Sequence, residues 1–170
     1  MLARELSSLT RPVRIDSLED ESEHAAIDAD ADDRERLARH YGIADIAYLR
    51  GDLDIERRGA IIRVAGTLEA ELGRTCVVSL EPMRETIIEP FAVEYTTAAP
   101  PPMAPTGEVE ADLDAPEPLD ADHLDLGDVL LEQLVLSMSP HPKKPGAQPP
   151  ADPGAGRETS PFDVLKTLKE

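Results

Sequence analysis

The sequence predicts a small α+β fold: an antiparallel β-meander of about four to six strands, a short helix before it, an apolar helix after it, and Pro-rich linkers. Three observations support this. Apolar and polar residues alternate over much of 46–96, a helical pattern covers Ala31–Tyr41, and Leu126–Met138 is apolar over most of its length. The 170 residues suit one domain with tails. We expect a single domain at 1–139 with an acidic Pro-rich insert at about 97–122, a Pro-rich linker at 140–160 and a short amphipathic tail at 161–170.

Two extended pieces and a helix are expected before the meander. Arg11–Ile15 and His24–Asp30 are candidate strands, although both are short. In Ala31–Tyr41 the acidic residues come first and the basic residues last, which is the order that the helix macrodipole favours. Gly42 follows as a C-terminal cap, so we predict one helix of three turns.

The meander itself is predicted from its period of two. A first alternating run ends in a hairpin turn at 56–59, where Gly59 is able to adopt a positive φ. Ile62–Leu72 has the clearest alternation and should be a strand with one wet face. Short strands are expected at Thr75–Leu80 and at Thr86–Tyr95.

The second helix follows a Pro-rich acidic segment that we expect to be extended and disordered through Asp122. Asp125 is a suitable N-cap, and Asp128 stands three residues later, as in a capping box. Apolar side chains cover most of the circumference of Leu126–Met138, so this helix must be largely buried. Packing against the sheet is favoured over packing against another protein.

Acidic residues are concentrated in one part of the chain. Glu85–Pro142 holds thirteen Asp and Glu residues and no Lys or Arg, and the whole chain has a formal net charge of −18. Nucleic-acid binding depends chiefly on Lys and Arg, which displace counterions from phosphates. The charge therefore favours a basic protein partner, although an acidic surface is often present only for solubility.

Few residues suggest a catalytic or metal-binding site. Cys76 is the only cysteine, lies in a strand-like pattern and has no His or Lys nearby in sequence, so we interpret it as a buried structural residue. Asp28, Asp30 and Asp32 imitate the opening of a calcium loop, but the required Gly and Glu are missing. None of the common nucleotide, protease or hydrolase motifs occurs. We expect neither an enzyme nor a metal or cofactor, and no small-molecule substrate.

The cellular location is predicted from the lack of membrane-spanning and secretory-signal patterns in the sequence. No run approaches the roughly 18 apolar residues of a membrane span, and the first residues lack the apolar segment of a secretory signal. A single cysteine excludes an internal disulfide. We expect a cytoplasmic protein without membrane contact.

Two sets of residues are candidate contacts. Basic residues in the meander form a possible RNA-binding set, or else a solvated strand face interleaved with Glu; they are Arg57, Arg58, Arg63, Arg74 and Arg84. The start of the second helix and the C-terminal tail form a possible partner-binding set: Asp125, Leu126, Asp128, Phe162, Leu165 and Leu168. The tail is equally suited to docking on its own domain and on a partner.

Three motifs, taken in order, resemble those of the YceD family, the large-ribosomal-RNA-subunit accumulation proteins of bacteria and plastids. The first is Thr75–Pro82; the second is Asp125–Asp128, which leads into Pro140-x-Pro142; the third is Ser160–Leu165. The motif residues are Cys76, Leu80, Glu81, Pro82, Gly127, Pro140, Pro142 and Pro161, together with those named above. Many relatives have Cys-x-x-Cys where this chain has Cys76 and Ser79, so a metal role is not carried over.

The resemblance implies a non-enzymatic factor that supports accumulation of 23S ribosomal RNA through its synthesis, processing or stability. A basic large-subunit ribosomal protein is one candidate partner, because the family's gene commonly adjoins that of one such protein and because this chain is acidic. Precursor large-subunit ribosomal RNA, contacted through the arginines, is the other. The alternative outside ribosome assembly is an acidic protein–protein adaptor that docks through Phe162, Leu165 and Leu168.

Overall fold

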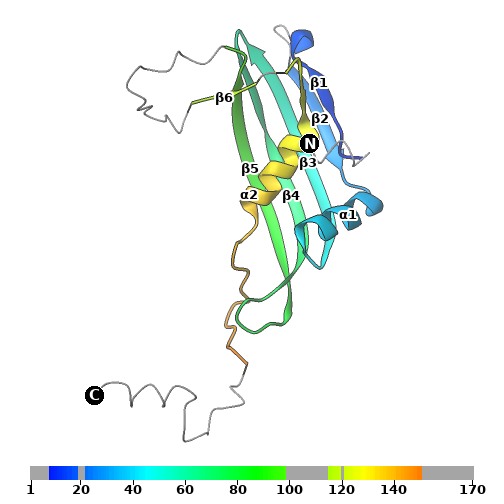
Figure 1. Cartoon of the computed structure of the whole chain (residues 1–170), viewed down its shortest axis with the longest axis vertical. Helices are drawn as coiled ribbons and strands as arrows, with labels where there is room; N and C mark the ends of the chain where they lie inside the picture. Colours follow the sequence, from blue (N-terminus) through cyan, green and yellow to red (C-terminus); the bar gives the residue numbers. More distant parts are fainter. Residues whose placement is uncertain (1–7, 19–21, 99–114, 120, 151–170) are drawn as a thin grey trace, which may run out of the picture.

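The computed structural model of the chain describes residues 8–18, 22–98, 115–119 and 121–150 (Figure 1). Strands hold more of these residues than helices do, and the two α-helices come before and after the three long strands in the sequence. In chain order the elements are β1 (Pro12–Arg14), a 3-10 helix (Ile15–Leu18), β2 (Ser22–Asp28), α1 (Ala31–Tyr41), β3 (Asp45–Arg58), β4 (Ile61–Thr75), β5 (Pro82–Thr96), β6 (Glu117–Pro118), β7 (His123–Asp125) and α2 (Leu126–Ser137).

The main sheet has the strand order β2-β3-β4-β5-β6. Its first four strands pair antiparallel in sequence order, as predicted for a meander, whereas β6 pairs parallel with the end of β5. A second, two-stranded sheet joins β1 to β7. The α+β class is therefore confirmed, and the meander is extended by a parallel edge strand that the alternation did not predict.

The three long strands differ most from the prediction at the end of β4. The strand predicted to end at Leu72 continues through Gly73, which pairs with both Asp45 and Arg84. The predicted strand Thr75–Leu80 is wrong: β4 ends at Thr75, and a loop follows in which Leu80 donates its N–H to the carbonyl of Cys76. The first hairpin turn is closer to expectation, since Gly59 has a φ of 64°.

Helix α1 has the predicted bounds for local reasons. Asp30 is the N-cap, and its side chain accepts a hydrogen bond from the N–H of Asp33. Gly42 ends the helix in the left-handed conformation, with a φ of 65°. Both signals lie within four residues of the helix, so they act without help from the rest of the fold.

Both helices contribute to one hydrophobic core on the same face of the main sheet (Figure 1). Helix α2 lies across β4 and β5, and α1 packs against β3. The packing of α2 on the sheet confirms the favoured prediction for this helix. Its wholly buried side chains include Leu126, Leu130 and Leu134, whereas Leu136 at its last turn is 70% exposed.

Part of the segment that we expected to be disordered is fixed by its backbone. Leu119 donates its N–H to the carbonyl of Thr96, and the carbonyl of Asp122 accepts the N–H of Ile15. These bonds hold β6 and β7 in place, so the prediction of disorder through Asp122 is wrong for residues 117–119 and 121–122. Residues 99–114 and 120 lie outside the described residues.

The junction of α2 and β6 predicts a pH-dependent stability. The side chain of Glu132 is exposed, yet partial desolvation of its carboxyl group by the surrounding chain raises its pKa, and Glu117 raises it further. A carboxyl group whose pKa is raised on folding destabilises the folded state when it ionises. The resulting loss of folding stability should therefore grow as the pH rises above about 4.5. We expect Glu132→Gln to raise the Tm at pH 7 and to have little effect at pH 4, as measured by thermal unfolding across this range. The exposed Glu89→Gln is the control, and an equal gain at both pH values would contradict the prediction.

Candidate interaction surfaces

Two of the motifs meet at the β4–β5 end of the sheet. The backbone N–H of Val77 lies 2.9 Å from the carbonyl oxygen of Pro142. Lys144 contacts the same loop twice, through its backbone N–H, 3.4 Å from Cys76 Sγ, and through Nζ, 3.0 Å from Glu81 Oε2. The residues after α2, which we predicted to begin a linker, therefore pack against the loop at 76–81. The first motif is therefore in contact with the Pro140-x-Pro142 end of the second.

A partly buried ion pair fixes the exit of α2 to this end of the sheet. Arg74 Nη1 lies 2.8 Å from Glu85 Oε2, and each side chain is only 14% exposed. Ser139, just beyond the helix, is bound by both: its carbonyl accepts a hydrogen bond from Arg74, and its N–H donates one to Glu85. Ser139 therefore closes a three-residue clasp, which we call the Arg74 clasp.

Cys76 is buried, as predicted, but it lies in the loop and not in a strand. Its Sγ accepts hydrogen bonds from the backbone N–H groups of Ser79 and Lys144. Hydrogen bonding from Ser79 and then Lys144 lowers the pKa of the thiol to about 6, against the opposing effect of burial. With 0% exposure the sulfur is closed to solvent, so it holds the loop together and offers no access to a substrate. In the part of the chain that the structure describes, no group of three or more metal-binding side chains converges.

The start of α2 holds the N-terminal segment. Asp125 is 9% exposed, and its Oδ1 accepts the N–H groups of both Arg11 and Gly127 at 2.9 Å. Leu126 is fully buried and donates its N–H to the carbonyl of Arg11. A Cβ on Gly127 would lie 2.2 Å from the carbonyl oxygen of Leu9. Asp125, Leu126 and Gly127 thus have structural roles inside the domain.

A second buried aspartate, which the sequence did not single out, holds the same segment from the other helix. Asp33 in α1 is 1% exposed, and its Oδ2 accepts both the N–H and the hydroxyl of Ser8. Its position in the first helical turn indicated only a favourable charge. The additional role depends on Ser8, which is 25 residues away.

The five candidate RNA-binding arginines form two groups at opposite ends of β4. Arg57, Arg58 and Arg63 lie near the β3–β4 turn, and Arg74 and Arg84 lie near the β4–β5 loop. At roughly 3.3 Å per strand residue, Arg63 and Arg74 are about 36 Å apart along β4. The structure does not bring the five side chains together.

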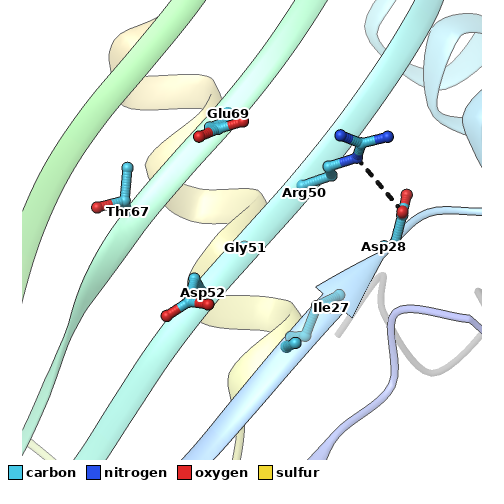
Figure 2. A pocket seen from close by; sticks show the side chains of 8 residues that line it. Ile27, Asp28, Arg50, Gly51, Asp52, Thr67 and Glu69 are labelled. Carbon is cyan, nitrogen blue, oxygen red and sulfur yellow. Dashed lines mark ion pairs between the residues drawn. The ribbon is translucent and has the colours of Figure 1, made fainter.

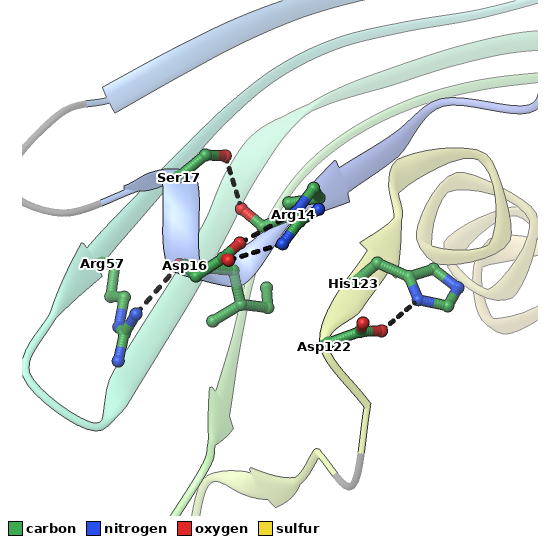
Figure 3. A network of polar contacts seen from close by, with 7 residues as sticks. Arg14, Asp16, Ser17, Arg57, Asp122 and His123 are labelled. Carbon is green, nitrogen blue, oxygen red and sulfur yellow. Dashed lines mark hydrogen bonds and ion pairs between the residues drawn. The ribbon is translucent and has the colours of Figure 1, made fainter.

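Each of these arginines also has partners within the chain. Arg57 donates to the carbonyls of Ile15 and Gly59, and Figure 3 shows the first of these bonds beside the Arg14–Asp16 ion pair. Arg58 and Arg63 pair with Glu56, and Arg84 pairs with Asp45 and Glu71. The phosphate contacts proposed for these residues stay a prediction.

The opposite face of the main sheet is not covered by any described element. Strand pairing arranges its residues in four rows across β2, β3, β4 and β5, which together we call the acidic face. In order along the sheet the rows are Asp28–Arg50–Glu69–Ile88, Ala26–Asp52–Thr67–Pro90, His24–Asp54–Ala65–Ala92 and Ser22–Glu56–Arg63–Glu94. All of these residues are exposed or partly exposed.

The acidic face is negatively charged, and the side chains in its middle rows are mostly small. Its four rows contain six carboxylates and two arginines, a net charge of 2 − 6 = −4 with His24 neutral. The two middle rows, which we call the low band, carry small side chains at five of their eight positions: Ala26, Thr67, Pro90, Ala65 and Ala92. A cavity of about 300 Å³ opens where the first two rows meet. Figure 2 shows it between Asp28, Arg50, Asp52, Thr67 and Glu69, with α2 behind the strands.

The cations of the acidic face leave part of its negative charge without a partner. Arg50 pairs with Asp28 at 3.3 Å, and Arg63 lies 4.0 Å from Glu56. His24 lies 3.1 Å from Asp54 and 3.8 Å from Asp52. Among the residues that the structure describes, Glu69 and Glu94 have no ion-pair partner.

The remaining predicted contact residues are placed as follows. Asp128 is partly buried in the first turn of α2. The tail residues Phe162, Leu165 and Leu168, and Pro161 before them, lie outside the described residues. Neither described α-helix is long and apolar enough to cross a membrane.

One comparison with known proteins gives a match. A family model described as large ribosomal RNA subunit accumulation protein YceD matches residues 64–169, which is more than half of the chain. The matched range contains all three motifs, the loop at 76–81, the Arg74 clasp and α2. No curated protein and no solved structure matches the chain.

Proposed function

The chain belongs to the YceD family of large ribosomal RNA subunit accumulation proteins, and we propose from this premise that it is a non-enzymatic factor of ribosome assembly. In this proposal it supports accumulation of 23S ribosomal RNA by binding a basic large-subunit ribosomal protein in the cytoplasm. Bound in this way, the basic protein is kept from non-specific contacts until it reaches the RNA. The RNA of the growing subunit then has the protein that it needs for processing and stability.

The observation that supports this proposal most is the uncovered acidic face, on a chain with a net charge of −18. Most basic ribosomal proteins are built to neutralise phosphates, so an acidic protein surface competes for the same cationic side chains. Long-range attraction between opposite charges also speeds encounter. A preformed acidic surface fits this role.

Direct binding of precursor ribosomal RNA is the weaker form of the proposal. Affinity for RNA grows with the number of phosphates that Lys and Arg neutralise together. The candidate arginines are divided between the two ends of β4, and Arg74 is mostly buried in its clasp. An anionic surface of this size near RNA would also oppose binding.

Depletion of the protein in its host is the experiment that tests the ribosomal role. We expect the ratio of large-subunit to small-subunit ribosomal RNA to fall, because unassembled large-subunit RNA is degraded, and the unsubstituted gene should restore the ratio. RNA is quantified by electrophoresis and by primer extension across precursor ends. An unchanged ratio with depletion confirmed would contradict the ribosomal role and would leave an adaptor that docks through residues 160–170 as the better account.

A further inference from the structure

We propose that the acidic face is the surface that holds the partner, and that the occupant of its low band is an extended, Lys- or Arg-rich segment of a basic protein. This inference rests on the proposed function and adds the site and the form of the ligand. The first argument comes from the pairing register of the strands. Because paired strands place their residues side by side, the low band runs across the strands and not along one of them.

The dimensions of the low band fit an extended polypeptide. Neighbouring strands are about 4.8 Å apart, so the band spans about 14 Å from β2 to β5. An extended chain advances roughly 3.3 Å per residue, so about four residues fit across it. Small side chains at Ala26, Ala65, Thr67 and Ala92 let a backbone approach the sheet closely.

Charge decides which extended segment fits. Asp52 and Asp54 stand inside the low band, and the unpaired Glu69 and Glu94 stand in the rows on either side of it. A bound segment therefore meets carboxylates below and on both flanks, and cationic side chains alternating in direction would reach all of them. An acidic or phosphorylated ligand would be repelled at the same positions.

Three charge-neutralising substitutions on the acidic face test the inference against a matched control. The face variant is Asp52→Asn, Glu69→Gln and Glu94→Gln. The control variant is Asp32→Asn, Glu35→Gln and Glu89→Gln, which removes the same three charges from exposed positions on α1 and on the other side of β5. Both variants have a net charge of −15, so only the location of the change differs.

Binding is measured with each small basic large-subunit ribosomal protein of the host, purified in turn, by calorimetry in about 50–300 mM salt. We expect the unsubstituted chain to bind one of them with an affinity that falls with salt. The face variant should weaken binding about tenfold or more and flatten the salt dependence, whereas the control variant should change it less than about threefold. A second variant, Ala65→Leu, fills the low band without changing charge and should also weaken binding.

The outcomes separate the two proposals. If the unsubstituted chain binds and both triple variants bind equally less well, or if Ala65→Leu has no effect, the inference about the acidic face is overturned while the proposed function stands. If the unsubstituted chain binds none of these proteins, the proposed function fails and the inference fails with it. Tight binding of precursor ribosomal RNA that the face variant strengthens would also overturn the inference, since it would show that this face repels the true ligand.

Discussion

Gly127→Ala should destabilise the domain by about 2–3 kcal/mol, the upper part of the roughly 1–3 kcal/mol typical of forcing extra atoms into a packed site. The added Cβ would stand 2.2 Å from the carbonyl oxygen of Leu9, which is a backbone atom and cannot swing away as the end of a flexible side chain could. Asp125 fixes the turn before the helix through the N–H groups of Arg11 and Gly127, so neither segment can retreat without losing hydrogen bonds. Chemical unfolding of the purified variant measures the change.

The sign of this effect is diagnostic. Judged by helix propensity alone, Gly→Ala within a helix is stabilising by up to about 1 kcal/mol. A loss of stability would therefore show that contact with the N-terminal segment decides the outcome. Leu136→Ala serves as the control on the same helix, because that side chain is 70% exposed and its removal should change stability by less than about 0.5 kcal/mol. A neutral or stabilising Gly127→Ala would mean that residue 9 does not lie where the structure places it.

Arg74→Met should cost about 3 kcal/mol of folding stability, because it leaves the mostly buried Glu85 without its cation. The substitution keeps much of the aliphatic stem, so the loss reports on the ion pair and on the hydrogen bond to Ser139. The double variant with Glu85→Gln should be less destabilised than the sum of the single changes. Thermal and urea unfolding of the four proteins give the coupling energy.

Arg84→Met is the matched control for the Arg74 clasp. Arg84 follows in the same hairpin and pairs with Asp45, but both side chains are about half exposed, so its loss should cost less than about 1 kcal/mol. Equal costs for the two arginines would contradict the clasp. The comparison also matters for RNA-binding experiments, since a loss of binding in an Arg74 variant would first have to be separated from a loss of folded protein.

The sequence predicted best the features that depend on neighbours along the chain. Helix α1 begins and ends as expected because Asp30 and Gly42 act on backbone groups within four residues. The alternation in β4 identified the core face because side chains of a strand point alternately to its two sides. Asp125 was recognised as an N-cap for the same local reason. The motifs identified the family without any knowledge of the fold.

The tertiary structure decided the features that depend on residues far apart in sequence. Asp125 also binds Arg11, which is 114 residues away, and Arg74 meets Ser139 across 65 residues, so no local pattern reports either contact. The base-free stretch Glu85–Pro142 suggested a basic partner, whereas the described acidic face is assembled mainly from β2, β3 and β4. Its low band exists because register sets Ala26, Thr67 and Pro90 side by side, and register is fixed only when strands pair. Composition therefore determined that the protein is acidic, and pairing determined where that charge forms a surface.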